Sequence, residues 1–378
     1  MLIHILTPGF TTPNSQGFLL PLLRHRDALK EAGVKLRVYR QAQADAADCD
    51  VLMIDSKFYR PWLRTNLERV VEQLSQLRKG AQRIFWFDTS DSAGTLQTGV
   101  LPYVDRYFKG QLLKDRSLYQ QALYGGRLFT HYLHHELNVH DESPTYLNPI
   151  LSKDDLSKLS LSWNYGLANL SLEGPAFSSL YQWLGWPVFL RTPARWDAPS
   201  ASRPLDFNCR FSASYPKATI RFQRASIQKL FRHKETDRVN RYSYFSELRQ
   251  SKIVLSPFGW GEINLRDFEA IVCGCLLIKP DISHLEAWPN IFEAGVTILT
   301  HDWSCRDVLE VVENALVSYA EHLTIARVAQ ERYQHSFRED VFLEMLLGLL
   351  NDSRPTRADT TNACLSGNQI SGGSYVEH

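Results

Sequence analysis

Short apolar runs alternate with longer amphipathic stretches in the first half of the chain. Four runs have the length and the β-branched or aromatic content of buried strands: Leu2–Leu6, Val34–Tyr39, Val51–Ile54 and Ile84–Phe87. Between them, Phe18–Ala32 repeats leucine at helical spacing and ends at Gly33, and Leu63–Leu77 is amphipathic. This strand–helix alternation predicts a parallel sheet with helices on both faces.

The same alternation returns in the second half, after an irregular middle. Its predicted strands are Leu205–Phe211, Ile253–Leu255, Leu276–Ile278 and Val296–Leu299, and its predicted helices are Ala218–Phe231, Asn264–Val272 and Val308–His322. The intervening segment Trp183–Pro204 holds four prolines and three tryptophans, a composition that suits a domain connection. We therefore expect an α/β protein with two Rossmann-like domains, residues 1–185 and 186–350. The polar tail, residues 351–378, has little to bury and is expected to be disordered.

Composition indicates that the chain can form two domains, and it bears on the binding partners and the compartment of the protein. The chain has 378 residues, of which 44% are hydrophobic and 22% charged, and this suffices for two cores. The formal net charge of +1 creates no overall field that would draw the chain to nucleic acid or to a membrane surface. Six cysteines occur without a C-x-x-C pair, which favours a reducing compartment over a disulfide scaffold.

No apolar stretch approaches the roughly 20 residues that a membrane-spanning helix needs. The first residues lack the basic segment of a signal peptide, and Pro8 and Gly9 end their apolar run. We expect a cytoplasmic protein. Peripheral contact with the inner face of the membrane stays open as a further property.

The most informative stretch is Ser251–Pro289, which is predicted to fold as a strand, a glycine-containing turn, a helix and a strand. Gly259 and Gly261 would let a ligand approach the backbone, and the helix beginning near Asn264 would point its free N–H groups at the same space. Arg266, in the first helical turn, could donate hydrogen bonds to a diphosphate. Glu269, one turn later, could accept hydrogen bonds from ribose hydroxyls. Together these residues predict a nucleotide site.

Each of these residues also has a purely structural interpretation. Gly-x-Gly is common at strand–helix junctions, Arg266 could be a solvated first-turn residue, and Glu269 could pair with a lysine. Their combination in one segment is more specific than any single part.

The segment resembles the donor-binding motif of the GT-B glycosyltransferases, and it is closest to the exostosin-like and bacterial polysaccharide-cluster transferases. The matching positions are Ser251-Lys252, Leu255, Pro257, Gly259-Trp260-Gly261, Arg266, Phe268-Glu269-Ala270 and Cys273-Gly274-Cys275. The resemblance implies a GT-B fold, in which two Rossmann-like domains with parallel sheets face each other across a cleft. It also implies that Glu269 holds the nucleotide ribose, and that the turn Gly259–Gly261, Trp260 included, holds the diphosphate together with Arg266.

One position departs from the family pattern. Many retaining members carry a second glutamate eight positions before the first, where this chain has Gly261, and Glu262 lies seven positions before Glu269 instead. Glu262 is therefore a candidate catalytic residue. Its role stays open, as does the choice between retention and inversion of the anomeric configuration.

Further candidates for donor binding lie on either side of this segment. Arg210 and Arg224 follow a strand that is expected to end at the cleft and could contact the donor's phosphates, although a run of cations is more often a solvated helix face. His284 follows the strand after the donor helix and could touch the sugar. The letters Asp48-Cys49-Asp50 match a D-x-D metal motif but precede their strand, so neither a metal nor another cofactor is expected.

Two aspartates of the first domain, Asp88 and Asp91, follow a predicted strand whose carboxyl end would lie at the ligand-binding edge of the sheet. Either carboxylate could act as a general base on an acceptor hydroxyl. Since Asp-Thr-Ser-Asp is also good turn chemistry, a structural role is the alternative for both.

These features predict a glycosyltransferase that moves a sugar from a nucleotide-sugar donor, bound by the C-terminal domain, to an acceptor bound by the N-terminal domain. The expected acceptor is a hydroxyl of a glycan or lipid-linked glycan, in surface polysaccharide biosynthesis. A polyol-phosphate transferase of the same fold and a non-catalytic nucleotide- or glycan-binding protein stay open as alternatives. A nicotinamide-dependent oxidoreductase is disfavoured, because no G-x-G-x-x-G follows the first strand.

Overall fold

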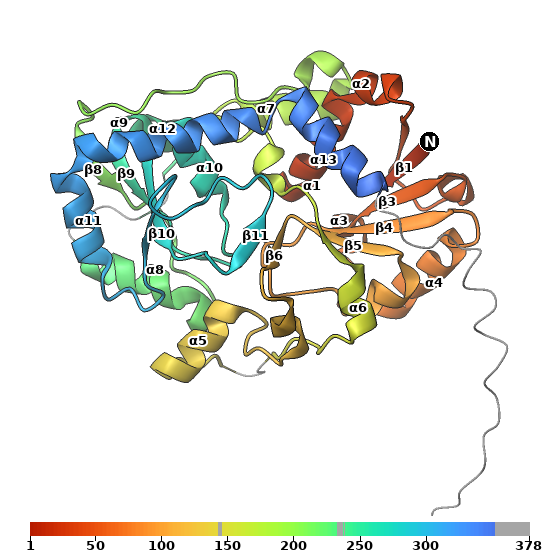
Figure 1. The fold of residues 1–378 in the computed structure, drawn as a ribbon, viewed down its shortest axis with the longest axis horizontal. Coiled ribbons are helices and arrows are strands. Elements are labelled where there is room, and N and C mark those ends of the chain that lie inside the picture. Colours follow the sequence, from red (N-terminus) through yellow and green to blue (C-terminus); the bar gives the residue numbers. More distant parts are fainter. Residues whose placement is uncertain (143–145, 233–236, 238, 352–378) are drawn as a thin grey trace, which may run out of the picture.

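Two parallel β-sheets, each covered by helices, make up the protein (Figure 1). The computed structural model describes residues 1–142, 146–232, 237 and 239–351. The predicted α/β class with two parallel sheets is confirmed. The expected disorder of the tail concerns residues that, from 352 onward, lie outside the described part of the chain.

The first sheet has six parallel strands in the order β2-β1-β3-β4-β5-β7. Their bounds are β1 (Leu2–Leu6), β2 (Lys35–Tyr39), β3 (Val51–Asp55), β4 (Arg83–Asp88), β5 (Arg106–Lys109) and β7 (Leu159–Leu161). Helix α4 (Leu67–Leu77) packs on one face, where Leu74 joins the core of Leu52 and Trp86. Helices α1 (Pro13–Arg24) and α2 (Arg26–Glu31) cover the other face. Strands buried on both faces explain why their sequences are continuous apolar runs.

The second sheet has four parallel strands in the order β12-β10-β9-β8. Its strands are β8 (Leu205–Asn208), β9 (Ser251–Leu255), β10 (Leu276–Pro280) and β12 (Leu299–His301). The helices around it are α8 (Ala218–Leu230), α9 (Arg241–Gln250), α10 (Leu265–Val272), α11 (Val308–Val317) and α12 (Tyr319–His335). Successive residues of β9 point to opposite faces of the sheet and pack in different cores: Ile253 packs with α11, and Val254 packs with α9 and α10.

Several short elements complete the described fold. The helices are α3 (Ser56–Tyr59), α5 (Leu128–Leu137), α6 (Lys153–Lys158) and α7 (Gly174–Leu184), and single 3-10 turns occupy Ala44–Ala47, Thr98–Tyr103, Arg116–Gln120, Tyr165–Leu167 and Pro187–Phe189. Within the described residues, no helix is both long and apolar enough to cross a membrane.

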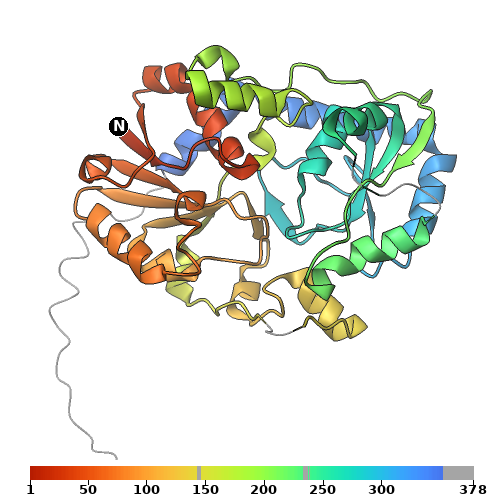
Figure 2. The ribbon, with the colours of Figure 1, turned by 180° about the vertical axis from the view of Figure 1, so that it is seen from behind.

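Two features tie the halves together. Strand β6 (Gln111–Leu113) of the first half pairs antiparallel with β11 (Leu285–Ala287) of the second, so a small sheet takes one strand from each. Helix α13 (Glu339–Asn351) crosses back to the first sheet, as Figures 1 and 2 show, where Phe342 and Leu346 pack with the strands. The chain after residue 338 therefore belongs physically with the N-terminal sheet. The domain division at residue 185 stays a prediction.

Element boundaries differ from the prediction at several places. The predicted helix Phe18–Ala32 is interrupted at His25, between α1 and α2, and the predicted strand Leu205–Phe211 ends at Asn208. The predicted helix Val308–His322 is two helices, because Ser318 leaves the helical conformation between α11 and α12. The predicted helix at Phe18 begins earlier, at Pro13, where the Thr12 side chain caps it by accepting from Ser15 N. The predicted last strand at Val296 starts instead at Leu299.

Candidate functional site at the junction of the two sheets

The loops that follow β4 and β9 contact each other at the carboxyl ends of the two sheets. Gly261 lies so close to the first half that a Cβ added to it would be 1.8 Å from the Asp91 carbonyl oxygen. Ala93 N donates to Glu262 Oε2 over 3.2 Å, and Ser92 Oγ donates to Glu262 Oε1 over 3.4 Å. Since open α/β sheets bind ligands at this edge, the junction is the natural candidate site.

Glu262 is fully buried in this junction. Burial raises the pKa of its carboxyl group, while the hydrogen bond from Ala93 N and the charge of Arg127 oppose the rise. Its contacts join the glycine turn of the second half to the loop of the first. This predicted catalytic residue therefore lies at the site, and its oxygens are directed at backbone and hydroxyl groups of the opposite loop.

Two arginines gather beside the glycine turn on the side of the second sheet. Arg224 donates from Nε to the Phe258 carbonyl oxygen over 2.7 Å, and its Nη2 lies 3.0 Å from the position of a Cβ on Gly259. The guanidinium carbons of Arg224 and Arg266 lie 5.5 and 5.2 Å from the centre of the Phe211 ring. Of the residues that sequence reasoning assigned to the donor, Arg224 therefore lies beside Gly259, and Arg224 and Arg266 contact the same Phe211 ring.

Glu269 lies in α10 and is 8% exposed. Its Oε1 accepts from Arg241 Nη1 over 3.2 Å, and Arg241 also donates to the carbonyl oxygens of Ser171 and Leu172. Burial raises the pKa of the Glu269 carboxyl group, whereas the nearby charges of Arg241 and Arg266 lower it. The carboxylate therefore stands between two arginines at the boundary between the halves.

The start of α10 is held in place by a buried ion pair. Asn264 is the N-cap of α10, which begins one residue later than predicted, and it forms a capping box with Asp267. Asp267 also accepts from Ser256 Oγ and from Lys279 Nζ, both over 2.5 Å, and the Lys279 and Asp267 side chains are fully buried. The turn that carries Gly259 and Arg266 is thereby fixed to β9 and β10.

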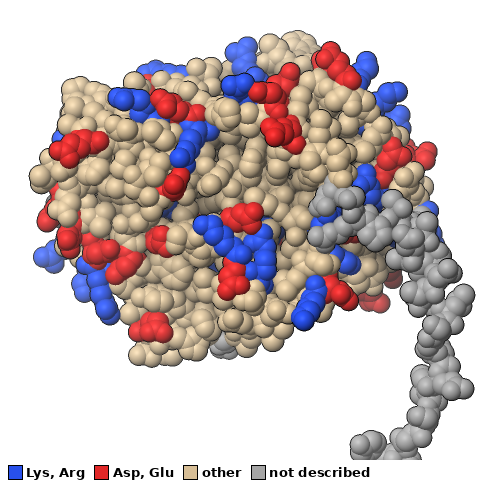
Figure 3. Space-filling model, viewed as in Figure 1, with Lys and Arg blue, Asp and Glu red and all other residues tan. Residues whose placement is uncertain are grey.

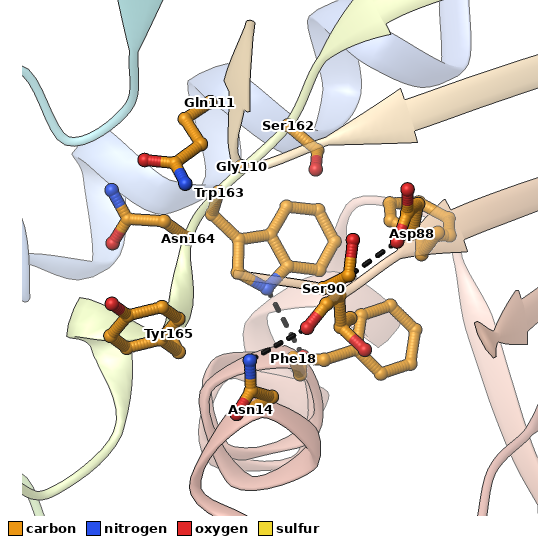
Figure 4. A pocket seen from close by; sticks show the side chains of 12 residues that line it. Asn14, Phe18, Asp88, Ser90, Gly110, Gln111, Ser162, Trp163, Asn164 and Tyr165 are labelled. Carbon is orange, nitrogen blue, oxygen red and sulfur yellow. Dashed lines mark hydrogen bonds between the residues drawn. The ribbon is translucent and has the colours of Figure 1, made fainter. Parts of the chain in front are cut away.

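A small cavity lies on the side of the first sheet, at the ends of β4, β5 and β7 (Figure 4). Its lining comes from the start of α1, from the loop after β4 and from the segment after β7: Asn14, Phe18, Phe87–Ser90, Gly110, Gln111 and Ser162–Tyr165. Its volume of about 20 Å³ is room for a single water molecule. The lining segments thus leave little space at this edge of the first sheet.

Asp88 and Asp91 have different surroundings at this edge. The Asp88 carboxylate is fully buried and accepts from Lys109 Nζ over 2.8 Å and from the Tyr107 hydroxyl over 2.6 Å. Burial raises its pKa, but Lys109 and the hydrogen bonds outweigh this and lower the pKa overall. Asp91 is only partly buried, and its Oδ1 accepts from Asn14 Nδ2 over 2.8 Å. The Asp88 carboxylate is thus buried and paired within the first half, whereas Asp91 lies at the junction of the two halves.

Arg127 is a residue of the junction that sequence reasoning missed. It donates from Nε to the Trp260 carbonyl oxygen over 2.7 Å, and its guanidinium carbon lies 5.6 Å from the centre of the Trp260 ring, which is 41% exposed. Burial lowers the pKa of Arg127, and the carboxylates of Glu262 and Asp91 oppose this. The one local signal in the sequence is the pair Gly125-Gly126 directly before Arg127, and in the structure both glycines adopt positive φ at the start of α5.

Arg210 and His284, two predicted donor contacts, engage other partners. Arg210 forms a bidentate ion pair with Glu247, and both nitrogen–oxygen distances are 2.8 Å. This pair connects the end of β8 to α9. The His284 ring packs edge-on against Trp303 with 5.0 Å between ring centres. Neither of its buried ring nitrogens has a hydrogen-bond partner among the described residues.

Replacing His284 with phenylalanine is expected to weaken the pH dependence of stability. Burial lowers the pKa of His284 from 6.5 to about 4. Between these values the unfolded chain binds a proton at His284 that the folded protein does not, so stability is lost as the pH falls. The drop in unfolding free energy from pH 7 to pH 5 should be about 2 kcal/mol smaller in the variant.

Urea unfolding at the two pH values measures this difference, with His335→Phe, at an exposed position of α12, as the matched control. An equal drop in His284→Phe and the wild type would show that this ring is solvated and free to titrate.

Comparison with known proteins supports the enzyme class. Residues 200–344, which span the second sheet and its helices, match the family model described as glycosyl transferase-like. No curated protein matches the sequence. The family match and the sequence prediction agree on a glycosyltransferase as the enzyme class.

Among solved structures, the chain is similar to an alpha-glucosyltransferase in complex with UDP-glucose and DNA, with 11% identity over 92% of this chain and 98% of that one, and a TM-score of 0.40. A glycosyltransferase from Rickettsia africae has 7% identity over 93% and 99% of the two chains, with a TM-score of 0.43. WaaG, a glycosyltransferase involved in lipopolysaccharide biosynthesis, has 13% identity over 93% and 100%, with a TM-score of 0.38.

Proposed function

We propose that this protein transfers a sugar from a nucleotide-sugar donor to a hydroxyl of a glycan or lipid-linked glycan, in the synthesis of a surface polysaccharide. An affinity with exostosin-like transferases is part of this proposal and rests on the motif around Gly259. The observation that carries the proposal is that Arg224 and Arg266 both contact the Phe211 ring, and that Arg224 also lies beside Gly259. This group lies in the part of the chain that matches the glycosyl transferase-like model.

The chemistry of the proposed donor site follows from its charges. A nucleoside diphosphate that leaves a sugar carries negative charge, and arginines held in place before the reaction stabilise it without reorganisation. Arg224 and Arg266 would bind the phosphates, with Gly259 allowing the close approach of the donor. Glu269, held by Arg241, would accept hydrogen bonds from the ribose. The proposal requires no resident cofactor or metal.

Asp91 is the general base in this proposal. Its carboxylate lies at the junction, where Asn14 orients it, and it would take the proton of the acceptor hydroxyl as that oxygen attacks the sugar. Such a single displacement inverts the anomeric configuration. Asp88 is not included, because its carboxylate is enclosed with Lys109. Glu262 is assigned the role of holding the two loops together.

Substrate entry requires the loops to separate. The cavity beside Asp88 has room for about one water molecule, and Gly261 is in contact with Asp91. A sugar bound between Gly259 and Asp91 would occupy the space that this contact now closes. Part of the favourable free energy of nucleotide binding would therefore offset the cost of opening the junction.

The test is donor binding by Arg266→Ala. Losing a charge-assisted contact to a diphosphate should raise the Kd for nucleoside diphosphates by about 10- to 100-fold, with the fold intact because Arg266 lies at the edge of the core. Thermal-shift titration with uridine, guanosine, adenosine and cytidine diphosphates measures it. Arg332→Ala, which removes a surface ion pair with Glu293, is the matched control.

Unchanged affinity of Arg266→Ala for every nucleotide that the wild type binds would remove Arg266 from the donor site. Product analysis separates the alternatives to sugar transfer. Release of a nucleoside diphosphate indicates sugar transfer, and release of a monophosphate indicates polyol-phosphate transfer. Binding without any cleavage of the donor indicates a non-catalytic protein.

A further inference from the structure

Three side chains that can bind metal ions gather where β12 ends and α11 begins. They are His301, the last residue of β12, and Asp302 and Asp307 in the segment that leads into α11. One ring nitrogen of His301 and one carboxylate oxygen of each aspartate all lie within 4.8 Å of one another. We call these three residues the β12–α11 cluster. Among the described residues, no other group of three such side chains comes this close together.

Hydrogen bonds within the loop account for the positions of the two aspartates. The Asp302 carboxylate accepts from Ser304 Oγ over 2.9 Å and from Arg306 N over 3.1 Å. The Asp307 carboxylate accepts from Asp302 N over 3.0 and 3.1 Å. Aspartates commonly shape turns in this way, so the two acids alone do not indicate a metal. A carboxylate has about four lone-pair positions, however, so both groups can also bind a cation.

The His301 ring, by contrast, has a nitrogen for which the fold provides no partner. The residue is 2% exposed. Its Nδ1 lies 2.7 Å from the Asp302 carbonyl oxygen, which can only accept, so Nδ1 carries the proton. The lone pair is therefore on Nε2, which is buried and has no hydrogen-bond partner among the described residues. A buried polar atom without a partner is costly, and a bound ion is one of the few groups that would satisfy it.

This pairing of the ring matches the way in which proteins hold a metal-binding histidine. Such a ring donates one N–H to a carbonyl or carboxylate oxygen, which fixes its orientation, and binds the ion with the other nitrogen. His4 has the first half of this pattern, because its Nδ1 lies 3.0 Å from the Ala46 carbonyl oxygen and its Nε2 is also unpaired. His4 belongs to no group of three metal ligands among the described residues. The two carboxylates beside the unpaired nitrogen therefore distinguish His301.

The charge around the cluster is negative. The segment 301–317 has one basic residue, Arg306, and four acidic residues: Asp302, Asp307, Glu310 and Glu313. Figure 3 shows acidic side chains gathered at the left edge of the molecule, where Figure 1 draws α11. Within the described part of the chain, no lysine or arginine forms an ion pair with Asp302 or Asp307. Lys279 acts electrostatically on His301, but its own charge is paired with that of Asp267. The surroundings thus attract a cation.

We propose that the β12–α11 cluster binds a divalent transition-metal ion such as Zn²⁺ or Mn²⁺. The imidazole nitrogen of His301 and one oxygen from each aspartate would be the protein ligands, and water would complete the coordination shell. A nitrogen ligand favours a transition metal over Mg²⁺ and Ca²⁺, which prefer oxygen ligands. Because Asp302 is exposed, an ion can reach the cluster from solvent.

The ion would have a structural role. It would connect the end of β12 to the start of α11 and hold the loop between them. That loop carries Trp303, whose ring centre lies 5.4 Å from that of Tyr132 in α5, and whose Nε1 donates to the Asp281 carbonyl oxygen over 2.7 Å. The ion would therefore stabilise a contact between the two halves. None of the residues proposed to bind the donor or to act as base is a ligand, so the inference does not depend on the proposed function.

The experiment is metal binding by the full chain after treatment with a chelator. Mn²⁺ is the probe, because electron paramagnetic resonance distinguishes its free and bound forms, and Zn²⁺ is then tested as a competitor. We expect about one Mn²⁺ per chain and a higher Tm with the ion bound. His301→Phe removes the nitrogen, and Asp302→Asn removes a charge but keeps an oxygen for the loop hydrogen bonds. Each should raise the Kd for Mn²⁺ by about 10- to 100-fold or more, the range that the loss of an outer hydrogen-bond partner already gives.

Two matched controls come from the first half. His4→Phe is the control for His301→Phe, and Asp115→Asn is the control for Asp302→Asn, because Asp115 also accepts from the serine two positions later, Ser117. Circular dichroism checks that each variant is folded. A wild type that binds neither Mn²⁺ nor Zn²⁺ would overturn the proposal, as would wild-type affinity in both Asp302→Asn and His301→Phe. Weaker binding in Asp302→Asn alone would also overturn it, because the site would then consist of oxygen ligands without His301.

Discussion

Replacing Lys279 with methionine is expected to lower the free energy of unfolding by about 3–5 kcal/mol. Lys279 and Asp267 form a salt bridge in which both side chains are fully buried. Methionine has a similar length but no charge, so the Asp267 carboxylate would be left buried without its cation. Lys279 also donates to the Glu262 carbonyl oxygen over 2.8 Å, and this contact would be lost too.

Urea unfolding followed by tryptophan fluorescence measures the effect. Lys252→Met is the control, because Lys252 pairs with the exposed Asp206 and such surface pairs contribute about 0–1 kcal/mol. The double variant Lys279→Met/Asp267→Asn should recover part of the loss, since it removes the unpaired charge. If Lys279→Met unfolds at the same urea concentration as the wild type, the buried pair does not stabilise the glycine turn.

Replacing Asp91 with asparagine is expected to lower kcat by about 10²- to 10⁴-fold, the usual contribution of a general base. Asparagine keeps the size of the side chain, and its amide oxygen can still accept from Asn14 Nδ2, so the loop should keep its structure. Nucleotide affinity should be unchanged, because the proposed donor contacts come from the second half. Steady-state transfer rates and thermal-shift titrations measure the two quantities.

Asp206→Asn is the control for this prediction, since Asp206 lies in β8 and its side chain is half exposed. A variant Asp91→Asn with wild-type kcat would exclude Asp91 as the base. A loss of nucleotide affinity with unchanged kcat would place Asp91 in the donor site instead.

The sequence was most informative where function depends on residues that are close along the chain. A helix that begins near Asn264, with Arg266 in its first turn and Glu269 one turn later, follows from the helical pattern of this segment. The glycine turn and its neighbours come from one segment, so the sequence could predict that they lie together. The same reasoning could not predict that Gly261 would pack against Asp91, which is separated from it by most of a domain.

The surroundings of Asp88 show what kind of information the sequence does not carry. Asp88 and Lys109 are direct partners in the register of β4 and β5, which is why their charges meet inside the fold. Without the strand order, Lys109 is only a cation at the end of an apolar run. Arg127 was overlooked for a related reason, because its contact with Trp260 joins residues from the two halves.

The β6–β11 pair determines how the junction could open. Gln111 of β6 donates from its side chain to the Asp91 carbonyl oxygen, and its Cα is paired with that of Ala287 in β11. The pairing of β6 with β11 joins the two halves along this ribbon. If the halves move apart to admit a donor, the ribbon is therefore the natural axis of rotation. Residues near the axis move least, so opening would separate Asp91 and Gly261, which are now in contact, less than residues of the two halves that lie farther from the ribbon. The ribbon would thus limit how far the donor side and the acceptor side can separate at the junction.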